Sequence, residues 1–312
     1  MEMRKLGQAG PEISVVGYGA WEAGGEVWGE ASEEQIMNAM EAAVDSGMNW
    51  FDTAEVYGQG RSEQMVGRFL AGPRRDKVLL FTKVAPDGTG VRPDQIRKAI
   101  QGSLKRLRTD YVDLYQIHWP AEDVPVEEYW GAMAGLQDEG LTRFIGVSNF
   151  DRALIERCLE IRHVDSVQNQ FSLLVQRDRD ELLPWLEEQG IGYLAYGPLA
   201  YGLLTGAITK DTKFSDDDWR SGKKWDVGYY ENLFAPGKFE RNVDLVERLR
   251  PVADRLGTSI ATLALRWAVE MAGVTGVIAG SRNQDHVRSN ASAGNLKLDE
   301  KTIEEINEIF AG

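Results

Sequence analysis

The sequence contains very little cysteine and histidine. Among 312 residues there is one cysteine, Cys158, and there are three histidines, at positions 118, 163 and 286. A single cysteine excludes an intrachain disulfide and is typical of a reducing compartment, so we expect a cytoplasmic protein. The histidines do not stand at metal-ligand spacing, so we expect no metal site. Cys158 lies in the helical pattern LIERCLEI, and we interpret it as a packing residue.

Long apolar runs and an excess of basic residues are also absent. No run of about 18 apolar residues occurs, so we expect no membrane-spanning helix. The opening segment MEMRKLGQAG has no apolar stretch of the kind found in signal peptides. Acidic residues outnumber basic ones by 49 to 35, which gives a formal net charge of −14. This charge argues against nucleic acid and anionic membranes as partners, so an anionic ligand must be met by a local group of donors.

Several familiar catalytic motifs are missing. The segment GYGAWE, at residues 17–22, is not a Rossmann fingerprint because Glu22 stands where the last glycine belongs. The segment GVSNF, at residues 146–150, is not the nucleophile elbow of a hydrolase because Phe150 replaces its last glycine. No P-loop is present either. Hydrolase and metalloenzyme functions are therefore disfavoured.

The sequence does contain a regular alternation of two patterns. Short apolar, strand-like runs occupy residues 14–20, 48–53, 77–85, 112–118, 142–148, 165–170, 190–197 and 273–280. Between them lie segments with apolar residues at helical spacing, such as residues 33–47, 93–107, 126–140 and 180–190. Plausible N-caps precede some of these helices, at Ser32, Ser62 and Asp151, and glycines end others, at positions 47, 140 and 190.

Eight strand–helix units predict an α/β fold, a (β/α)8 TIM barrel that forms one domain over residues 1–312. An open, doubly wound sheet is the alternative. Residues 4–14 precede the first barrel strand and are expected to form a short hairpin that closes the barrel bottom. After strand 7, residues 203–242 form a long irregular segment that carries Trp219, Trp225, Tyr229, Tyr230 and Phe234. Its aromatic content disfavours disorder, and we interpret it as a lid loop over a site.

Polar residues stand at the carboxyl ends of the predicted strands, where barrel enzymes place their active sites. Asp52 ends the second strand and Lys83 lies near the end of the third, so the two can form a buried ion pair. Tyr57 follows in a glycine-rich turn, and the Lys83 ammonium is expected to lower its pKa, which would make it a proton donor. His118, at the end of the fourth strand, can orient a substrate oxygen. Taken singly, each of these residues also has a structural interpretation.

Four separated segments resemble the aldo-keto reductase superfamily: FDTAEVYGQGRSEQMVG, LLFTKV with Lys83, DLYQIHWP with His118, and FIGVSNF. The resemblance extends from GYGAW to GSRNQDHVRSN, and the segments DTAEVYGQGRSE and YGPLAYGLLTG look most like the bacterial general-stress and potassium-channel beta-subunit branches. It implies a barrel that binds NADP(H) at its mouth, with NAD(H) as the alternative. It also implies hydride transfer to an aldehyde or ketone by the catalytic tetrad Asp52, Tyr57, Lys83 and His118, with Tyr57 as the general acid.

The resemblance further implies a set of nucleotide-binding residues. Ser148, Asn149 and Gln170 would hold the nicotinamide carboxamide, Tyr196 would stack on its ring, and Asn290 would meet the adenine. The pyrophosphate path would be lined by Gly197, Pro198, Leu199, Gly202 and Leu204. Gly280, Ser281 and Arg282 open a helix whose N–H groups suit a phosphate, and the charge of Arg282 favours a 2′-phosphate.

Two positions depart from the family pattern. His286 stands where glutamine is frequent, and Ala207 stands where a lysine often follows the segment LTG; Lys210, Lys213 and Arg220 are candidates to replace that lysine. Both departures concern nucleotide preference.

Trp21 and Trp119 are expected to wall the substrate pocket, with Trp28 and the aromatics of residues 219–234 as further candidates, and they suit a hydrophobic carbonyl. Trp185 and Trp267 lie on helical patterns and are interpreted as core residues. Two other functions stay open: a nucleotide-binding regulatory subunit with slow turnover, and a cofactor-free lyase or isomerase. We expect a monomer whose partner is a small-molecule carbonyl.

Overall fold

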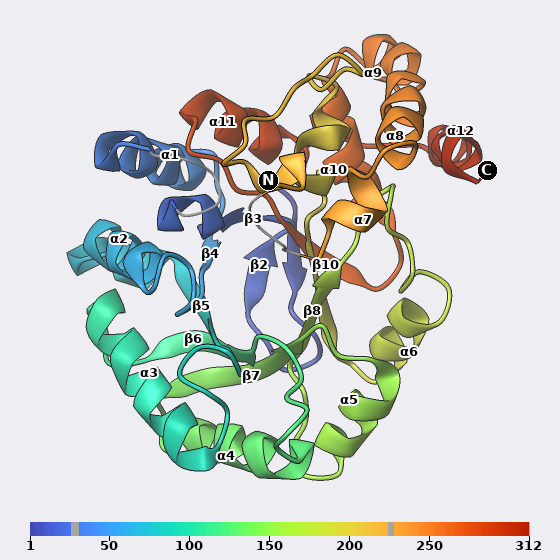
Figure 1. Cartoon of the computed structure of the whole chain (residues 1–312). Helices are drawn as coiled ribbons and strands as arrows, with labels where there is room; N and C mark the ends of the chain where they lie inside the picture. The colour runs from blue at the N-terminus through green and yellow to red at the C-terminus, as the bar shows by residue number, and fades with distance from the viewer. Residues whose placement is uncertain (26–30, 224–227, 312) are drawn as a thin grey trace.

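The computed structural model describes residues 1–25, 31–223 and 228–311. Eight parallel strands form a closed barrel in the order β10-β3-β4-β5-β6-β7-β8-β9. The strands are β3 (Val16–Gly19), β4 (Trp50–Asp52), β5 (Leu79–Val84), β6 (Val112–Ile117), β7 (Thr142–Ser148), β8 (Ser166–Gln170), β9 (Gly192–Tyr196) and β10 (Val274–Ile278). Figure 1 shows these strands at the centre of a ring of helices. The predicted (β/α)8 barrel is confirmed, and the open-sheet alternative is wrong because β10 pairs with both β9 and β3.

The helices alternate with the strands along the chain. They are α1 (Glu33–Asp45), α2 (Arg61–Phe69), α3 (Pro93–Leu107), α4 (Val126–Asp138), α5 (Arg152–Leu159), α6 (Leu182–Glu188), α7 (Tyr230–Leu233), α8 (Lys238–Glu247), α9 (Arg250–Arg255), α10 (Ile260–Glu270), α11 (Gln284–Ser292) and α12 (Glu300–Phe310). Four 3₁₀ turns add η1 (Trp21–Gly24), η2 (Gly72–Lys77), η3 (Ala200–Thr205) and η4 (Trp219–Ser221). Across the described ranges, no helix is both long and apolar enough to span a membrane.

The structure contains two of the three N-caps that the sequence predicts, and the third is absent. The side chains of Ser32 and Asp151 accept the N–H groups of Gln35 and Leu154, as N-caps do. Ser62 instead lies inside α2, which begins after Gly60 with φ near +89°. The Ser62 hydroxyl donates to the carbonyl of Ala20 at 2.7 Å. The prediction of Ser62 as an N-cap is therefore wrong, because this hydroxyl ties α2 to the end of β3.

A hairpin of β1 (Met3–Lys5) and β2 (Glu12–Ser14) closes the bottom of the barrel, as expected. Leu6 and Ile13 from this hairpin pack with barrel-interior side chains that include Trp50 and Phe81. The indole N–H of Trp50 donates to the carbonyl of Ser14 at 2.7 Å. Since apolar side chains fill the lower half of the barrel, polar groups gather at the other end, where the strands finish.

The long segment after β9 folds over that end. Trp219 is fully buried and packs edge-on against Tyr201 and Phe234, with ring centroids 5.1 and 5.3 Å apart. This aromatic cluster gives the segment a small core of its own. The structure confirms a long lid segment after the seventh barrel strand, but η3, η4, α7 and the start of α8 make it partly helical instead of irregular. Trp225 and Trp28 lie outside the described residues. Trp185 and Trp267 are core residues, as predicted, and Trp267 stacks on Phe171 at 5.7 Å.

Candidate active site

A cavity of about 1500 Å³ opens at the carboxyl ends of the strands and runs beneath the lid segment to the first turns of α11. Most residues predicted for the site line it. They are Trp21, Asp52, Tyr57, His118, Trp119, Ser148, Asn149, Tyr196, Gly197, Pro198, Leu199, Gly202, Gly280, Ser281, Arg282 and Asn290. Lys83, Gln170 and Leu204 were also predicted and are not among the described residues that line it. Such a cavity has room for a nucleotide together with a small substrate.

A buried ion pair lies at the floor of this cavity, where Asp52 lines it and Lys83 stands behind. The Lys83 ammonium donates to Asp52 Oδ1 at 2.5 Å, to the carbonyl of Thr53 at 2.9 Å and to the Tyr57 hydroxyl at 3.4 Å. These three contacts use all three donors of the ammonium, which is fully buried. Lys83 thus reaches the site from behind the cavity wall. Adjacent strands, β4 and β5, bring the pair together.

Two glutamines that the sequence interpretation missed complete this network. Gln168 donates to Asp52 Oδ2 at 2.9 Å, and Gln116 approaches the same oxygen at 3.5 Å. Gln168 lines the cavity, whereas Gln170 does not. The structure thus places Gln168, and not the predicted Gln170, at the wall of the cavity. Both side chains share one face of β8, and the place where that strand leaves the barrel rim decides which of them faces the cavity.

The pKa of Tyr57 moves in the direction opposite to the one expected. Burial raises it well above 10, and the charge of Asp52 raises it further. These contributions outweigh the attraction of the Lys83 ammonium, which lies 3.4 Å from the phenol oxygen and is paired with Asp52 at 2.5 Å. Tyr57 is therefore a fully protonated phenol at neutral pH. Since Lys83 can only donate to the phenol oxygen, the Tyr57 proton is left to point elsewhere.

His118 faces Tyr57 across the cavity. Its Nε2 lies 3.5 Å from the Tyr57 hydroxyl, and the Trp119 ring packs against the imidazole with centroids 3.8 Å apart. Burial, followed by the nearby charge of Lys83, lowers the pKa of His118 well below 6.5. The imidazole is therefore neutral at physiological pH. A neutral imidazole can donate one hydrogen bond to a substrate oxygen but is a poor proton source.

A chain of hydrogen bonds follows the rim from β7 to the lid. Asn149, in a left-handed conformation with φ near +63°, donates to the carbonyl of His118 at 2.9 Å and accepts from the Tyr196 hydroxyl at 2.6 Å. Ser148 donates to the Gln168 carbonyl at 2.7 Å. Tyr229, from the lid segment, donates to the Tyr196 hydroxyl at 3.3 Å. The predicted residues Ser148, Asn149 and Tyr196 thus form one connected group.

The turn after β9 has an unusual backbone. Gly197 and Gly202 have φ near +63° and +102°, and Ala200 and Tyr201 also lie in the left-handed region. Side chains rarely adopt this conformation, so the turn is strained where it borders the cavity. Its backbone is held by Arg220, whose Nη1 donates to the carbonyl of Tyr201 at 3.1 Å. Leu204, predicted here, is fully buried and packs in the core instead.

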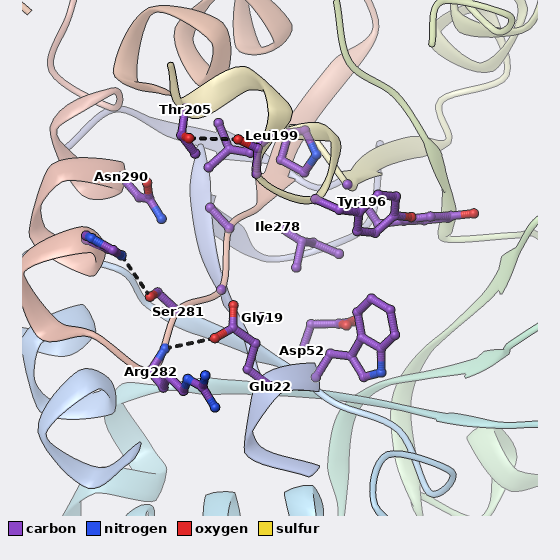
Figure 2. Close-up of a pocket in the computed structure, with 18 of the residues that line it drawn as sticks. Gly19, Glu22, Asp52, Tyr196, Leu199, Thr205, Ile278, Ser281, Arg282 and Asn290 are labelled. Atoms are coloured by element: carbon purple, nitrogen blue, oxygen red, sulfur yellow. Dashed lines mark hydrogen bonds between the residues drawn. The ribbon is translucent and has the colours of Figure 1, made fainter. Parts of the chain in front are cut away.

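The far end of the cavity is formed by the start of α11. Asn283 caps this helix by accepting the N–H of Asp285, and Ser281 lies 3.5 Å from His286 Nδ1. The backbone N–H of Arg282 donates to a carboxylate oxygen of Glu22 at 3.2 Å. Figure 2 shows Glu22 directed at this amide, with Asn290 and Ser281 on the same side of the cavity. In the sequence, Glu22 stands out only as the residue that breaks a glycine motif.

Aromatic side chains wall the part of the cavity next to Tyr57. The Trp21 ring lies 6.2 Å from that of Tyr57 and 6.1 Å from that of Tyr201, measured between centroids. Of the candidates at residues 219–234, Tyr229 lines the cavity. Trp219 and Phe234 are buried in the lid cluster. No group of three or more His, Cys, Asp or Glu side chains suited to a metal occurs in the part of the chain described.

Comparisons with known proteins identify the family of the chain. The model of the Aldo/keto reductase family matches residues 15–311. The chain is 33% identical to Aldo-keto reductase YhdN of Bacillus subtilis, over 99% of this chain and 94% of that protein. It is 31% identical to the NADH-specific methylglyoxal reductase of Escherichia coli, over 96% and 95% of the two chains. It is also 31% identical to a probable voltage-gated potassium channel subunit beta of Oryza sativa, over 94% and 91%.

Solved structures agree with the sequence relatives. The glycerol dehydrogenase AKR11B4 from Gluconobacter oxydans superposes with a TM-score of 0.87 at 30% identity, over 99% of this chain and 94% of that one. An aldo-keto reductase from Klebsiella pneumoniae, solved in complex with NADPH, superposes with a TM-score of 0.77 at 28% identity, over 99% and 96%.

Proposed function

The chain belongs to the aldo/keto reductase family, and we propose that it reduces an aldehyde or ketone to an alcohol with NADP(H), using Tyr57 as the general acid. One observation carries this proposal. The protonated Tyr57 phenol lies 3.4 Å from Lys83 Nζ and 3.5 Å from His118 Nε2, at the floor of a cavity large enough for a nucleotide.

The residues present fit a nicotinamide nucleotide. The far end of the cavity offers the start of α11 and the cations Arg282 and Arg220, which suit phosphate groups. Ser148, Asn149 and Gln168 offer amide and hydroxyl groups to a carboxamide, and Tyr196 presents a ring nearby. A reduced nicotinamide, when bound, supplies the hydride that a carbonyl carbon accepts.

The chain's own residues handle the proton. As the carbonyl carbon gains a hydride, its oxygen becomes basic, and Tyr57 donates its phenol proton to that oxygen. Lys83, held by Asp52, stabilises the phenolate that remains. His118 is neutral because its pKa is well below 6.5, so we assign it a hydrogen bond to the same oxygen rather than the proton transfer.

The walls of the cavity indicate the substrate class. Trp21, Trp119 and Tyr229 present apolar and aromatic surface next to Tyr57, which favours an aromatic or otherwise hydrophobic carbonyl. Two relatives bear the names of smaller oxygenated compounds, methylglyoxal and glycerol. Methylglyoxal is therefore the second substrate to test.

The deciding experiment measures nucleotide oxidation by the purified protein with 4-nitrobenzaldehyde or methylglyoxal, using NADPH and NADH in parallel. We expect the aromatic aldehyde to be reduced with the higher kcat/KM, and NADPH to be oxidised. No oxidation of either nucleotide with either substrate would contradict a reductase function.

A regulatory subunit with slow turnover is the second candidate, because two relatives are named as probable potassium channel beta subunits. This function requires nucleotide binding with slow release after one turnover. A single-turnover burst followed by a much slower steady state would favour it, and a linear time course at many turnovers would exclude it.

We further propose that the chain is one domain and acts as a monomer in the cytoplasm. A buried single cysteine, Cys158, supports a reducing compartment. Light scattering after size-exclusion chromatography tests the monomer, since a mass of about twice 34.8 kDa would indicate a dimer.

A further inference from the structure

Glu22 places a carboxylate inside the nucleotide end of the cavity, and neither the proposed proton transfer nor the barrel core uses it. Its Oε2 accepts the backbone N–H of Arg282 at 3.2 Å, at the residue that precedes the Asn283 cap of α11. In Figure 2 the Glu22 side chain enters the cavity between Asp52 and Arg282. Glu22 thus occupies an N–H group that would otherwise face an anionic ligand.

Neighbouring elements hold this carboxylate in place. Ala20, at the start of η1, donates its N–H to the carbonyl of Asp52 at 2.8 Å, and its own carbonyl accepts the Ser62 hydroxyl at 2.7 Å. Gly24, at the end of η1, lies so close to Gly58 that a Cβ on Gly58 would meet the Gly24 carbonyl oxygen at 2.3 Å. Because η1 is fixed at both ends, the backbone of Glu22 cannot withdraw from the cavity without disturbing the Tyr57 turn.

The charges that face Glu22 come from several elements. Burial raises the pKa of the Glu22 carboxyl, and the charges of Arg282, Arg220 and His286 lower it by less. Tyr18, on β3, is a further titratable group that interacts with Glu22. In its ionised form, Glu22 offsets part of the positive potential that Arg282 and Arg220 bring to an otherwise acidic chain.

We propose that Glu22 is a specificity-determining residue, whose negative charge disfavours a nucleotide with a 2′-phosphate relative to one with a 2′-hydroxyl. This inference rests on the proposed use of nicotinamide nucleotides. A carboxylate can accept a hydrogen bond from a ribose hydroxyl, but it repels a phosphate. Arg282 attracts the 2′-phosphate and Glu22 counteracts that attraction, so the preference of the wild-type protein for NADP(H) is smaller than Arg282 alone would give.

The test compares binding constants, which do not depend on catalysis. Isothermal titration calorimetry at pH 7.5 measures the Kd of NADP⁺ and of NAD⁺ for the wild type, Glu22→Gln and Glu160→Gln. Glutamine keeps the acceptor for the Arg282 N–H and removes the charge. Glu160, exposed at the end of α5, is the control for net charge. We expect Glu22→Gln to bind NADP⁺ about tenfold more tightly, with NAD⁺ changed less than about threefold. We expect Glu160→Gln to match the wild type.

Two outcomes overturn the inference in different ways. If the ratio of the two Kd values is the same in Glu22→Gln and the wild type, Glu22 does not select the nucleotide, while the proposed function stands. If the wild type binds neither nucleotide, the proposed function fails and the inference falls with it. Glu22→Ala serves as a second neutral variant and must shift the ratio in the same direction, and circular dichroism confirms that both variants are folded.

Discussion

Lys83 and Asp52 form an ion pair that is removed from water, with 2.5 Å between Nζ and Oδ1 and both side chains almost fully buried. The pairing stabilises two charges that would each be costly alone. Burial, followed by the charge of Asp52, raises the pKa of the neighbouring Tyr57, and the ammonium paired with Asp52 does not reverse that rise. The site therefore holds a phenol ready to give up its proton only when a strongly basic oxygen forms beside it.

Replacing Tyr57 by phenylalanine is expected to abolish carbonyl reduction while sparing nucleotide binding. The substitution removes the proton donor and leaves the ring, so kcat should fall about 10²- to 10⁴-fold. Steady-state kinetics and calorimetric titration with NADP⁺ measure the two effects separately. A Tyr57→Phe variant with the turnover of the wild type would disprove the assignment of the general acid.

Replacing Asp52 by asparagine is expected to destabilise the fold. The change leaves the buried Lys83 ammonium without its counter-charge, which costs about 3 to 5 kcal/mol. Burial already lowers the pKa of Lys83 below 10.5. The loss of stability should therefore shrink as the pH rises towards the lowered pKa of Lys83, because the side chain then becomes neutral. Urea denaturation at several pH values measures it, and the double variant Asp52→Asn/Lys83→Met should recover part of the loss at pH 7. Equal stability of Asp52→Asn and wild type would contradict the role given to the pair.

We expect the pH profile of reduction to show no inflection from the titration of a histidine. Burial lowers the pKa of His118 well below 6.5, so the imidazole stays neutral as pH falls from 8 to 6.5. The pKa of Tyr57 lies well above 10, so the phenol stays protonated as pH rises. With NADPH saturating, kcat/KM for the aldehyde should be flat between about pH 6.5 and 9. An inflection close to pH 6.5 that disappears in His118→Ala would show that His118 titrates in the working range.

The two glutamines of β8 allow a test substitution, at Gln168, and a matched control, at Gln170. Gln168→Leu removes the 2.9 Å donor to Asp52 Oδ2 and leaves the approach of Gln116 at 3.5 Å. We expect its kcat to fall about tenfold, which corresponds to about 1.4 kcal/mol. Gln170→Leu, two residues away and outside the described cavity lining, should keep the wild-type value. The reverse pattern would show that the strand presents Gln170 to the substrate after all.

Trp119 offers a test of the substrate class. The ring centroids of Trp119 and His118 lie 3.8 Å apart, and the Trp119 residue is about one-third exposed. Trp119 therefore forms a wall that an aromatic substrate can contact. Trp119→Ala should raise KM for 4-nitrobenzaldehyde about tenfold and change KM for methylglyoxal much less. Equal effects on both substrates would indicate that Trp119 acts through His118 instead of through substrate contact.

The sequence by itself determined the order of strands and helices, the barrel, the closing hairpin and the position of the lid. These features depend on local periodicity and on the apolar content of each segment, which are written along the chain. It also determined that Asp52, Tyr57 and His118 line the same cavity, because each lies at or just after the carboxyl end of a parallel strand, and such ends meet at one rim.

Only the tertiary structure decided how those groups act on one another. Burial of Tyr57 beside the Asp52 carboxylate reversed the expected pKa shift of Tyr57, and residue spacing does not encode burial. The point at which β8 leaves the barrel rim presented Gln168, and not Gln170, to the cavity. The approach of η1 to α11 brought Glu22 to Arg282, 260 positions away in the chain. Charge interactions depend on separation and burial in space, and both are set by packing between segments that are remote in sequence.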